Sequence, residues 1–351
     1  MSGGVDSSVA AALLVERGYD VLGVTMRLWT EEDSGASRHH RRCCSVEDTE
    51  DARAACDALG VRHYVLNFER EFSESVVETF VSEYEQGRTP NPCLACNDRV
   101  KFRPLLAQAL ALEADYLATG HYARIRESGA VFELWTGADA GKDQSYVLYT
   151  LGQAELSRTL FPVGEHAKSE IREIARRHGL PNAEKPDSAD ICFIPSGDYR
   201  AFVRERAAAR PGAIVDGAGT KVGEHTGIIG YTVGQRRGLP ARGGGEPLFV
   251  VGLDAESDEV IVGPEEELLA GGLVAEDVTF VSGSAPGERF RASARIRYRS
   301  APAAAEVTVV EGGRMEVRFE RPQRAVTPGQ AVVLYEGERV MGGGTIASAL
   351  P

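Results

Sequence analysis

The sequence lacks several features that would place the protein in a special class. It has no run of about 18 apolar residues that could span a bilayer. Its N-terminus has neither the basic start nor the apolar core of a signal peptide. We therefore expect a soluble, cytoplasmic protein with no membrane partner. Lysine is also scarce, since only five of the 39 basic residues are lysine, and we interpret this scarcity as a bias of the coding genome.

The composition is otherwise that of an ordinary globular protein. The 351 residues suffice for two or three domains, and the 43% hydrophobic content suits normal cores. A net charge of −13 argues against indiscriminate nucleic-acid binding, although it leaves room for a local basic face. In a reducing compartment, the six cysteines are expected to bind metal or do chemistry more often than to form structural disulfides. A buried thiol is the ordinary alternative for each of them.

Helix-like and strand-like segments alternate in the first part of the chain. Ala/Leu-rich Ser8–Arg17 predicts a helix that stops at Gly18, and Ser45–Gly60 predicts a second helix with a capped start. Strands are expected over Tyr19–Met26 and Arg62–Phe68, with a polar loop over Thr30–Arg42. Such alternation indicates a parallel sheet covered by helices, an α/β fold.

The pattern changes after about residue 200. From there the chain is rich in Gly, Val and short alternating segments such as Arg314–Glu320 and Ala331–Tyr335. This pattern is typical of small antiparallel sheets or barrels. We find no internal repeat and no long low-complexity segment.

The first residues carry the strongest single motif, SGGVDSS at Ser2–Ser8. Two glycines let the backbone approach an anion, and the amides that open the following helix point toward it. A Gly-Gly pair alone is more often a tight turn. The whole string, however, resembles the pyrophosphate loop of the ATP-pyrophosphatase (PP-loop) superfamily, whose members activate a carbonyl oxygen with AMP. In that superfamily a strand precedes the loop, whereas this chain begins at the loop. Either the natural start lies upstream or the chain is shortened.

Further stretches narrow the resemblance. TGHYAR (Thr119–Arg124), GKDQSYVL (Gly141–Leu148), DSADICFIP (Asp187–Pro195), HTGIIGYTVGQRRGL (His225–Leu239) and TPNPCLACN (Thr89–Asn97) together resemble the tRNA-specific 2-thiouridylases. The resemblance extends from residue 2 to about residue 330. It implies a PP-loop (adenine nucleotide alpha hydrolase-like) domain over 1–200, a small linking tRNA-binding domain over 201–270 and a C-terminal β-barrel over 271–351.

The resemblance also implies an activity and a set of site residues. The enzyme adenylates O2 of the wobble uridine with ATP and Mg²⁺ and then substitutes sulfur, after turning the base out of the anticodon stack. The phosphates and adenosine are expected at Ser2, Gly3, Gly4, Val5, Asp6, Ser7, Ser8, Met26 and Gly120. The target base and the tRNA are expected at Asn91, Pro92, Cys93, His121, Lys142, Asp143, Gln144, Arg297, Tyr298 and Gln330. Without the motif context, His121 would be an ordinary polar residue after a strand, and Lys142 and Asp143 a solvated turn.

Three cysteines leave the sulfur route open. In many family members the counterpart of Cys192 carries a persulfide, and the counterpart of Cys96 attacks it as partner nucleophile and forms a disulfide with it. The position of Cys93 is then an aspartate, but here it is cysteine. Cys93, Cys96 and Cys192 offer three thiolates, which suits a 4Fe-4S cluster with one open iron, the interpretation that we place first. Persulfide chemistry comes second, and zinc or inert cysteines last, because a closed zinc site needs four ligands.

Two other clusters have plainer interpretations. His39-His40-Arg41-Arg42-Cys43-Cys44 is expected to be an ordinary polar loop, since adjacent ligands fit tetrahedral coordination poorly, and Cys56 is expected in a helix core. Glu288–Arg299 contains five arginines, and alternate arginines on a strand project from one face that can neutralise phosphates. Such a stripe is equally often a soluble surface. Gln235, Arg236 and Arg237 suggest a second tRNA contact region.

Two classes of function follow. The first is ATP-dependent tRNA thiolation, with a cysteine desulfurase or sulfur-carrier protein as sulfur donor and the tRNA anticodon region as partner. The second is a non-catalytic iron–sulfur or tRNA-binding module with a decayed ATP site. Formation of AMP and pyrophosphate in the presence of unmodified tRNA distinguishes them.

Overall fold

The computed structural model describes residues 1–28, 46–186, 191–194, 197–240 and 247–351. They divide into two compact units. Unit 1 comprises Met1–Val77, Pro92–Asp198 and Glu338–Val340, and unit 2 comprises Glu78–Asn91, Tyr199–Gly337 and Met341–Pro351. In the described part of the chain, no helix combines the length and the apolar character needed to cross a bilayer.

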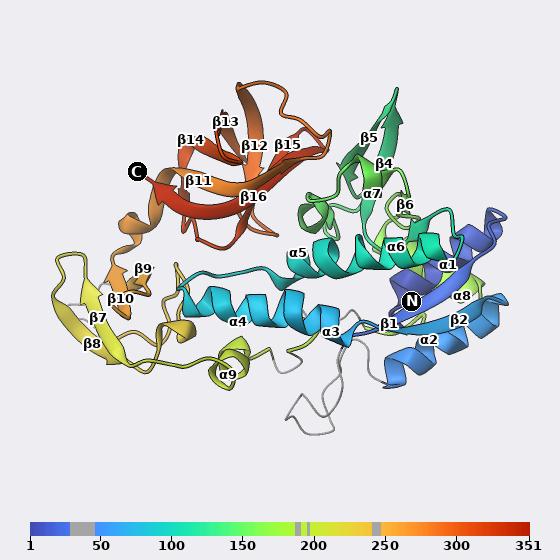
Figure 1. The fold of residues 1–351 in the computed structure, drawn as a ribbon, viewed down its shortest axis with the longest axis horizontal. Helices are drawn as coiled ribbons and strands as arrows, with labels where there is room; N and C mark the ends of the chain where they lie inside the picture. The colour runs from blue at the N-terminus through green and yellow to red at the C-terminus, as the bar shows by residue number, and fades with distance from the viewer. Residues whose placement is uncertain (29–45, 187–190, 195–196, 241–246) are drawn as a thin grey trace. The chain divides into compact units, whose positions relative to one another are not determined.

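Unit 1 is an α/β unit (Figure 1). Its helical segments are α1 (Val5–Glu16), α2 (Val46–Leu59), α3 (Glu69–Phe72), η1 (Ser73–Val77), α5 (Pro92–Cys96), η2 (Asn97–Lys101), α6 (Pro104–Ala111), η3 (Ser145–Leu148), α7 (Gln153–Leu156) and α8 (Lys168–Arg177). Its strands are β1 (Leu22–Arg27), β2 (Arg62–Asn67), β3 (Leu117–Ala118), β4 (Ala123–Ser128), β5 (Val131–Thr136) and β6 (Thr159–Leu160). β1 pairs with β2 and β3 with β6, both in parallel.

The first elements form where the sequence predicts them. α1 is apolar on nearly every side and buried, as a central helix must be. It ends before Gly18, whose φ of +83° is a conformation that glycine adopts without a steric penalty. Val5, Val9 and Leu13 of this helix share one core with Ile171 and Ile174 of α8. The predicted loop over Thr30–Arg42 lies outside the described residues.

Unit 2 is mainly β. Its helical segments are α4 (Glu78–Glu85), α9 (Tyr199–Arg204), η4 (Ile228–Gly230) and η5 (Glu265–Leu268). β7 (Gly212–Asp216), β8 (Lys221–His225), β9 (Phe249–Asp254) and β10 (Glu259–Gly263) form a sheet in the order β8-β7-β10-β9. The remaining strands are β11 (Leu269–Phe280), β12 (Arg289–Arg295), β13 (Ala303–Val310), β14 (Arg314–Arg324), β15 (Ala331–Glu336) and β16 (Arg339–Leu350).

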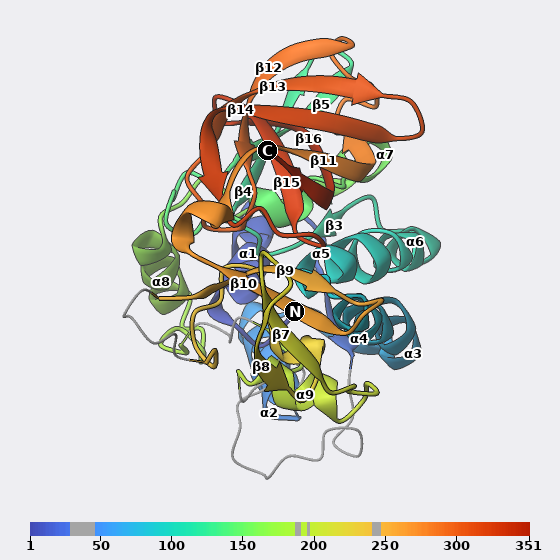
Figure 2. The same ribbon diagram turned by 90° about the vertical axis from the view of Figure 1, so that its left-hand side faces the viewer.

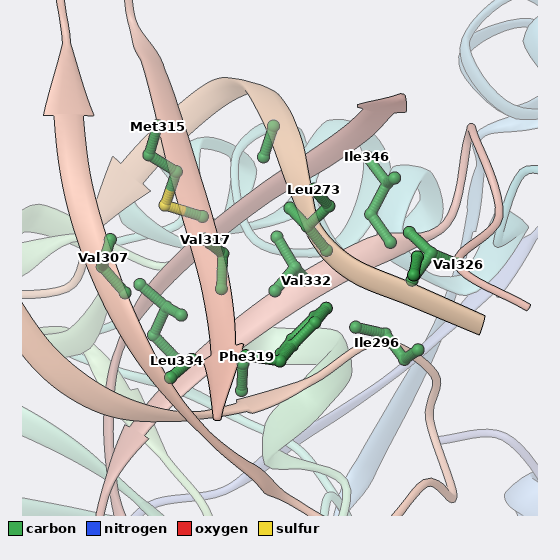
Figure 3. Packing of buried hydrophobic residues seen from close by; sticks show 14 residues of the cluster. Leu273, Ile296, Val307, Met315, Val317, Phe319, Val326, Val332, Leu334 and Ile346 are labelled. Atoms are coloured by element: carbon green, nitrogen blue, oxygen red, sulfur yellow. The ribbon is translucent and has the colours of Figure 1, made fainter. Parts of the chain in front are cut away.

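These last six strands close into a barrel (Figure 2). They follow the order β11-β14-β13-β12-β15-β16, and β16 also pairs with β11. Alternate residues point inward, so Met315, Val317 and Phe319 of β14 meet Val332 and Leu334 of β15 in one core (Figure 3). The predicted mainly β character after residue 200 and the terminal barrel are confirmed.

Candidate functional site

The SGGVDSS loop opens directly into α1. Gly4 is the N-cap residue, and no side chain caps the helix, so the first amides of α1 are left for another acceptor. Gly3 has a φ of +71°, and a Cβ at this position would collide with the carbonyl oxygen of Asp48. Only glycine therefore fits there. Helix N-termini with unused amides are a common place for anions to bind, so this geometry is compatible with the predicted phosphate loop.

Serines and one amide fix the shape of this loop. The hydroxyls of Ser7 and Ser8 donate to the Gly4 carbonyl at 3.1 and 3.2 Å. The buried amide of Asn182 donates to the Gly3 carbonyl at 3.0 Å and to Ser8 Oγ at 2.9 Å. Ser8 is thus used by the fold itself, and the sequence did not reveal Asn182. Ser2 is exposed and contacts Ser7.

Asp6 stands at the centre of a charged network that sequence reasoning missed. Lys168 Nζ lies 2.7 and 2.9 Å from the two carboxylate oxygens of Asp6. The hydroxyl of Tyr122 donates to Asp6 Oδ1 at 2.7 Å. The Lys168 side chain is 13% exposed and that of Asp6 32% exposed, so the pair is partly desolvated and open on the carboxylate side. The sequence offered one weak signal for Lys168, which is one of only five lysines among 39 basic residues.

The two motifs around residues 120 and 144 support this network. The Gln144 side-chain oxygen accepts from the Tyr122 backbone amide at 3.0 Å, and the Gln144 backbone amide donates to the Tyr122 carbonyl at 2.9 Å. A Cβ on Gly120 would lie 2.7 Å from the Ser7 amide nitrogen, so the chain passes close to the loop. Asp143 accepts from Gly137 and Ser145, while Lys142 is half-buried. Gln144 and Asp143 therefore have internal partners, and their predicted tRNA contacts stay predictions.

Unit 1 also contains Met26 and His121. Met26 lies on β1, opposite Leu66 of β2. His121 is half-buried, and its Nδ1 lies 2.8 Å from Thr119 Oγ1. Its ring is packed against Phe102 and Phe161, at centroid distances of 5.8 and 6.0 Å. Desolvation, with the positive charge of Lys101 as a smaller cause, holds the pKa of His121 well below its usual 6.5, so the ring is neutral.

The cysteines of TPNPCLACN lie on α5. Cys93 is half-buried and Cys96 is buried, and the helix continues into η2. Buried Asn97 follows at once, donating to the Val147 carbonyl at 2.9 Å and accepting from Lys101 at 3.0 Å. Cys192 is half-buried, beside Phe193, whose ring packs edge-on against Phe72 at 5.5 Å.

The iron–sulfur expectation gains no support from this arrangement. Within residues 1–28, 46–186, 191–194, 197–240 and 247–351, no group of three or more His, Cys, Asp or Glu could hold a metal ion. Cys93, Cys96 and Cys192 therefore do not fit a cluster as they lie here. Each is a thiol and not half of a disulfide. Cys56 is a core residue as predicted, and burial raises the pKa of its thiol. The segment His39–Cys44 lies outside the described residues.

Unit 2 contains the other predicted residues. Gln330 donates its side-chain amide to the Thr89 carbonyl at 2.7 Å, and the Thr89 amide donates to the Pro328 carbonyl at 2.8 Å. The chain then passes from unit 2 to unit 1 at the bond between Asn91 and buried Pro92. A barrel loop thus anchors the start of TPNPCLACN.

The arginine stripe is present on β12, which ends at Arg295. Phe290, Ala292 and Ala294 face the barrel core, and Arg289 and Arg291 are exposed on the other side. Arg297 lies beyond the strand, where its guanidinium donates to the Ala325 carbonyl at 2.6 Å. Tyr298 follows it and stacks with Arg299, whose guanidinium carbon lies 5.8 Å from the ring centroid.

The chain thus combines an α/β unit, which a glycine loop opens, with a mainly β unit that ends in a barrel. This combination is that of a multidomain protein with a PP-loop-like α/β domain. Residues 1–196 match the family described as tRNA methyl transferase HUP domain, residues 200–264 the tRNA methyl transferase PRC-barrel domain, and residues 270–346 the aminomethyltransferase beta-barrel domain.

Curated relatives narrow the class. The tRNA-specific 2-thiouridylase of Roseiflexus castenholzii is 52% identical over 365 residues, which cover 99% of this chain and 98% of that protein. That of Geobacter metallireducens is 52% identical over 355 residues, covering 100% and 96%. That of Moorella thermoacetica is 51% identical over 354 residues, covering 99% and 98%. The chain therefore belongs to the tRNA-specific 2-thiouridylase family, and the predicted fold class is confirmed.

Proposed function

We propose that this protein uses ATP to replace O2 of the wobble uridine in tRNA with sulfur. Membership of the family makes it a tRNA sulfurtransferase. The observation that carries the ATP step is the uncapped helix start at Gly4 with the Asp6–Lys168 pair beside it. An uncapped helix start attracts phosphate oxygens, and a carboxylate there suits a phosphate-bound Mg²⁺. The proposed domain bounds remain 1–200, 201–270 and 271–351.

In the first step, uridine O2 attacks the α-phosphorus of ATP and pyrophosphate leaves. An amide-like carbonyl is a poor electrophile and oxide a poor leaving group, so transfer of AMP to O2 makes C2 reactive. The α1 amides, with Ser2 and Ser7, receive the pyrophosphate. Bound Mg²⁺ would be held by Asp6 and would neutralise phosphate charge. Lys168, which holds Asp6 before ATP binds, supplies a second positive charge.

In the second step, sulfur displaces AMP from C2. We propose that the terminal sulfur of a persulfide on Cys192 attacks C2, and that AMP leaves with the former O2. The Cys96 thiolate then attacks Cys192 Sγ, which breaks the bond to the transferred sulfur and leaves 2-thiouridine and a Cys96–Cys192 disulfide. An external thiol must reduce this disulfide, and a cysteine desulfurase or sulfur carrier must reload Cys192.

Three observations support the persulfide route over the cluster. The three cysteines do not form a metal-holding group among the described residues. Cys96 is buried, which shields a reactive intermediate from water. Cys192 is half-buried and so can be reached by a donor. The cysteine at position 93 is the feature that still favours a cluster, and it provides the test.

The Cys93→Ala variant separates the two routes. Under the persulfide route, only Cys96 and Cys192 exchange sulfur, so Cys93→Ala keeps activity within about tenfold of the parent, whereas Cys192→Ala abolishes it. The measurement is single-turnover thiolation of unmodified tRNA under anaerobic conditions, with iron assayed in each preparation. Loss of iron and activity together in both variants would establish the cluster instead.

A further inference from the structure

A small polar cavity of about 160 Å³ lies in the linking part of unit 2. It is lined by Arg200 and Arg204 of α9, by the segment around η4, and by Gln235 and Gly238 of the GQRRGL stretch. No carboxylate is among its described lining residues. This cavity is therefore cationic in a protein whose net charge is −13.

Arg200 is held in place and yet has unused hydrogen-bonding capacity. Its Nη2 donates to Gln235 Oε1 at 2.9 Å, and its guanidinium carbon lies 5.6 Å from the centroid of the Tyr199 ring. Tyr199 is itself stacked on Tyr84 at 5.1 Å. Arg200 Nε, however, is buried without a hydrogen-bond partner among the described residues. A buried donor without a partner is costly, and the residue that carries it lines the cationic cavity.

Arg204 in the cavity lining, and Arg236 and Arg237 next to Gln235 in the chain, also lack ionic partners among the described residues. Across the described part of the chain, no carboxylate forms an ion pair with Arg204, Arg236 or Arg237, and all three are exposed. The nearby arginines outside this group behave differently. Arg206 pairs with Glu205 at 3.3 Å, and Arg210 pairs with Asp258 at 3.7 Å. The positive charge at the cavity is thus left for a ligand.

The size of the cavity and the charge beside it identify the ligand class. Pockets for whole small molecules usually measure about 300–1,000 Å³, so this one suits a single phosphate group. Exposed Arg236 and Arg237 adjoin Gln235 in the chain and add charge outside the cavity, which one small anion would not need. A polyanion such as an RNA backbone would place one phosphate in the cavity and its neighbouring phosphates against the outside charge.

We propose that Arg200 and Arg204 form a subsite for one backbone phosphate of the tRNA. Gln235 orients Arg200, and Arg236 and Arg237 extend the contact to neighbouring phosphates. The inference rests on tRNA being the substrate, as the proposed function states, and it adds a defined phosphate contact in the linking part of unit 2.

The test is equilibrium binding of unmodified tRNA between about 50 and 200 mM salt, without ATP. Each neutralised phosphate contributes about 0.9 to the slope of log affinity against log salt. We expect Arg204→Gln and Arg200→Gln each to reduce this slope by about 0.9, which is roughly a threefold smaller loss of affinity over that salt range. Arg206→Gln is the matched control and should keep the parental slope, because Arg206 already pairs with Glu205.

The salt slope of Arg204→Gln decides whether the subsite binds tRNA. Exposed Arg204 can be replaced without disturbing packing, so an unchanged slope in Arg204→Gln would overturn the subsite even if Arg200→Gln failed to fold. Calorimetric titration with inorganic phosphate forms a second arm. Arg204-dependent phosphate binding with an unchanged tRNA slope would assign the cavity to a free anion and overturn the RNA assignment. Because ATP is absent, a failure of the adenylation step leaves this result intact, whereas a parent protein that binds no tRNA would overturn the proposed function as well.

Discussion

At the scale of single residues, the proposed use of ATP depends on the pair of Asp6 and Lys168. Lys168 is the first residue of α8 and is 162 positions from Asp6 in the chain, so no local pattern joins them. The motif SGGVDSS predicted Asp6, because its chemistry is contained in a short string. Lys168 could not be predicted, since its role arises from tertiary packing of α8 against α1.

Lys168→Met should lower pyrophosphate release by about 100-fold or more, because a fixed charge that acts on developing negative charge contributes this much. Tyr122→Phe, which keeps the ring and removes the hydroxyl that donates to Asp6, should cost less than tenfold. Pre-steady-state release of pyrophosphate measures both. Equal effects in the two variants would show that Lys168 acts only by holding Asp6.

The lowered pKa of His121 predicts how the free energy of unfolding depends on pH. Its pKa in the folded protein lies well below the usual 6.5, so below about pH 6.5 the unfolded chain binds a proton that the folded chain does not. The contribution of the neutral ring to the free energy of unfolding is therefore complete above pH 6.5 and is lost as the pH falls below it. Urea unfolding at pH 5 and pH 7 should show a smaller pH dependence in His121→Gln. An equal pH dependence in the parent and in His121→Gln would contradict the lowered pKa of His121 in the folded protein.

At the scale of elements, several boundaries could be predicted and several could not. The end of α1 follows from Gly18, and the inward faces of β14 follow from alternation at Met315, Val317 and Phe319. The arginine stripe on β12 followed from the same alternation. Arg297 lies outside that strand and bonds to Ala325, because the strand ends at Arg295, a boundary that period-2 patterning does not reveal.

Asn97, the first residue of η2, links this helix to η3 through its hydrogen bond to Val147. Asn97→Ala removes the donor to the Val147 carbonyl and leaves a buried acceptor unsatisfied, which should lower the free energy of unfolding by about 1–3 kcal/mol. Thiolation should fall as well, since Cys96 directly precedes it. Exposed Gln108→Ala on α6 is the control and should be neutral. Chemical denaturation measures the stability, and a neutral Asn97→Ala would remove Asn97 from the support of Cys96.

At the scale of the whole molecule, each of the two compact units is built from several separate segments of the chain. Unit 2 takes Glu78–Asn91 from within the first part of the sequence, and unit 1 takes back Glu338–Val340. Composition predicted the change from α/β to mainly β near residue 200. It could not predict these exchanges, because pairing between distant segments, such as Gln330 with Thr89, leaves no periodic signal.

The central claim is that this protein activates tRNA with ATP, and one measurement tests it most directly. ATP labelled at the α-phosphate is incubated with the protein and unmodified tRNA, and AMP and pyrophosphate are quantified alongside tRNA binding. We predict tRNA-dependent formation of both products by the parent, and loss of both in Asp6→Ala with tRNA affinity nearly unchanged. If the parent binds tRNA but forms neither product, or if Asp6→Ala releases pyrophosphate at the parental rate, the account is contradicted.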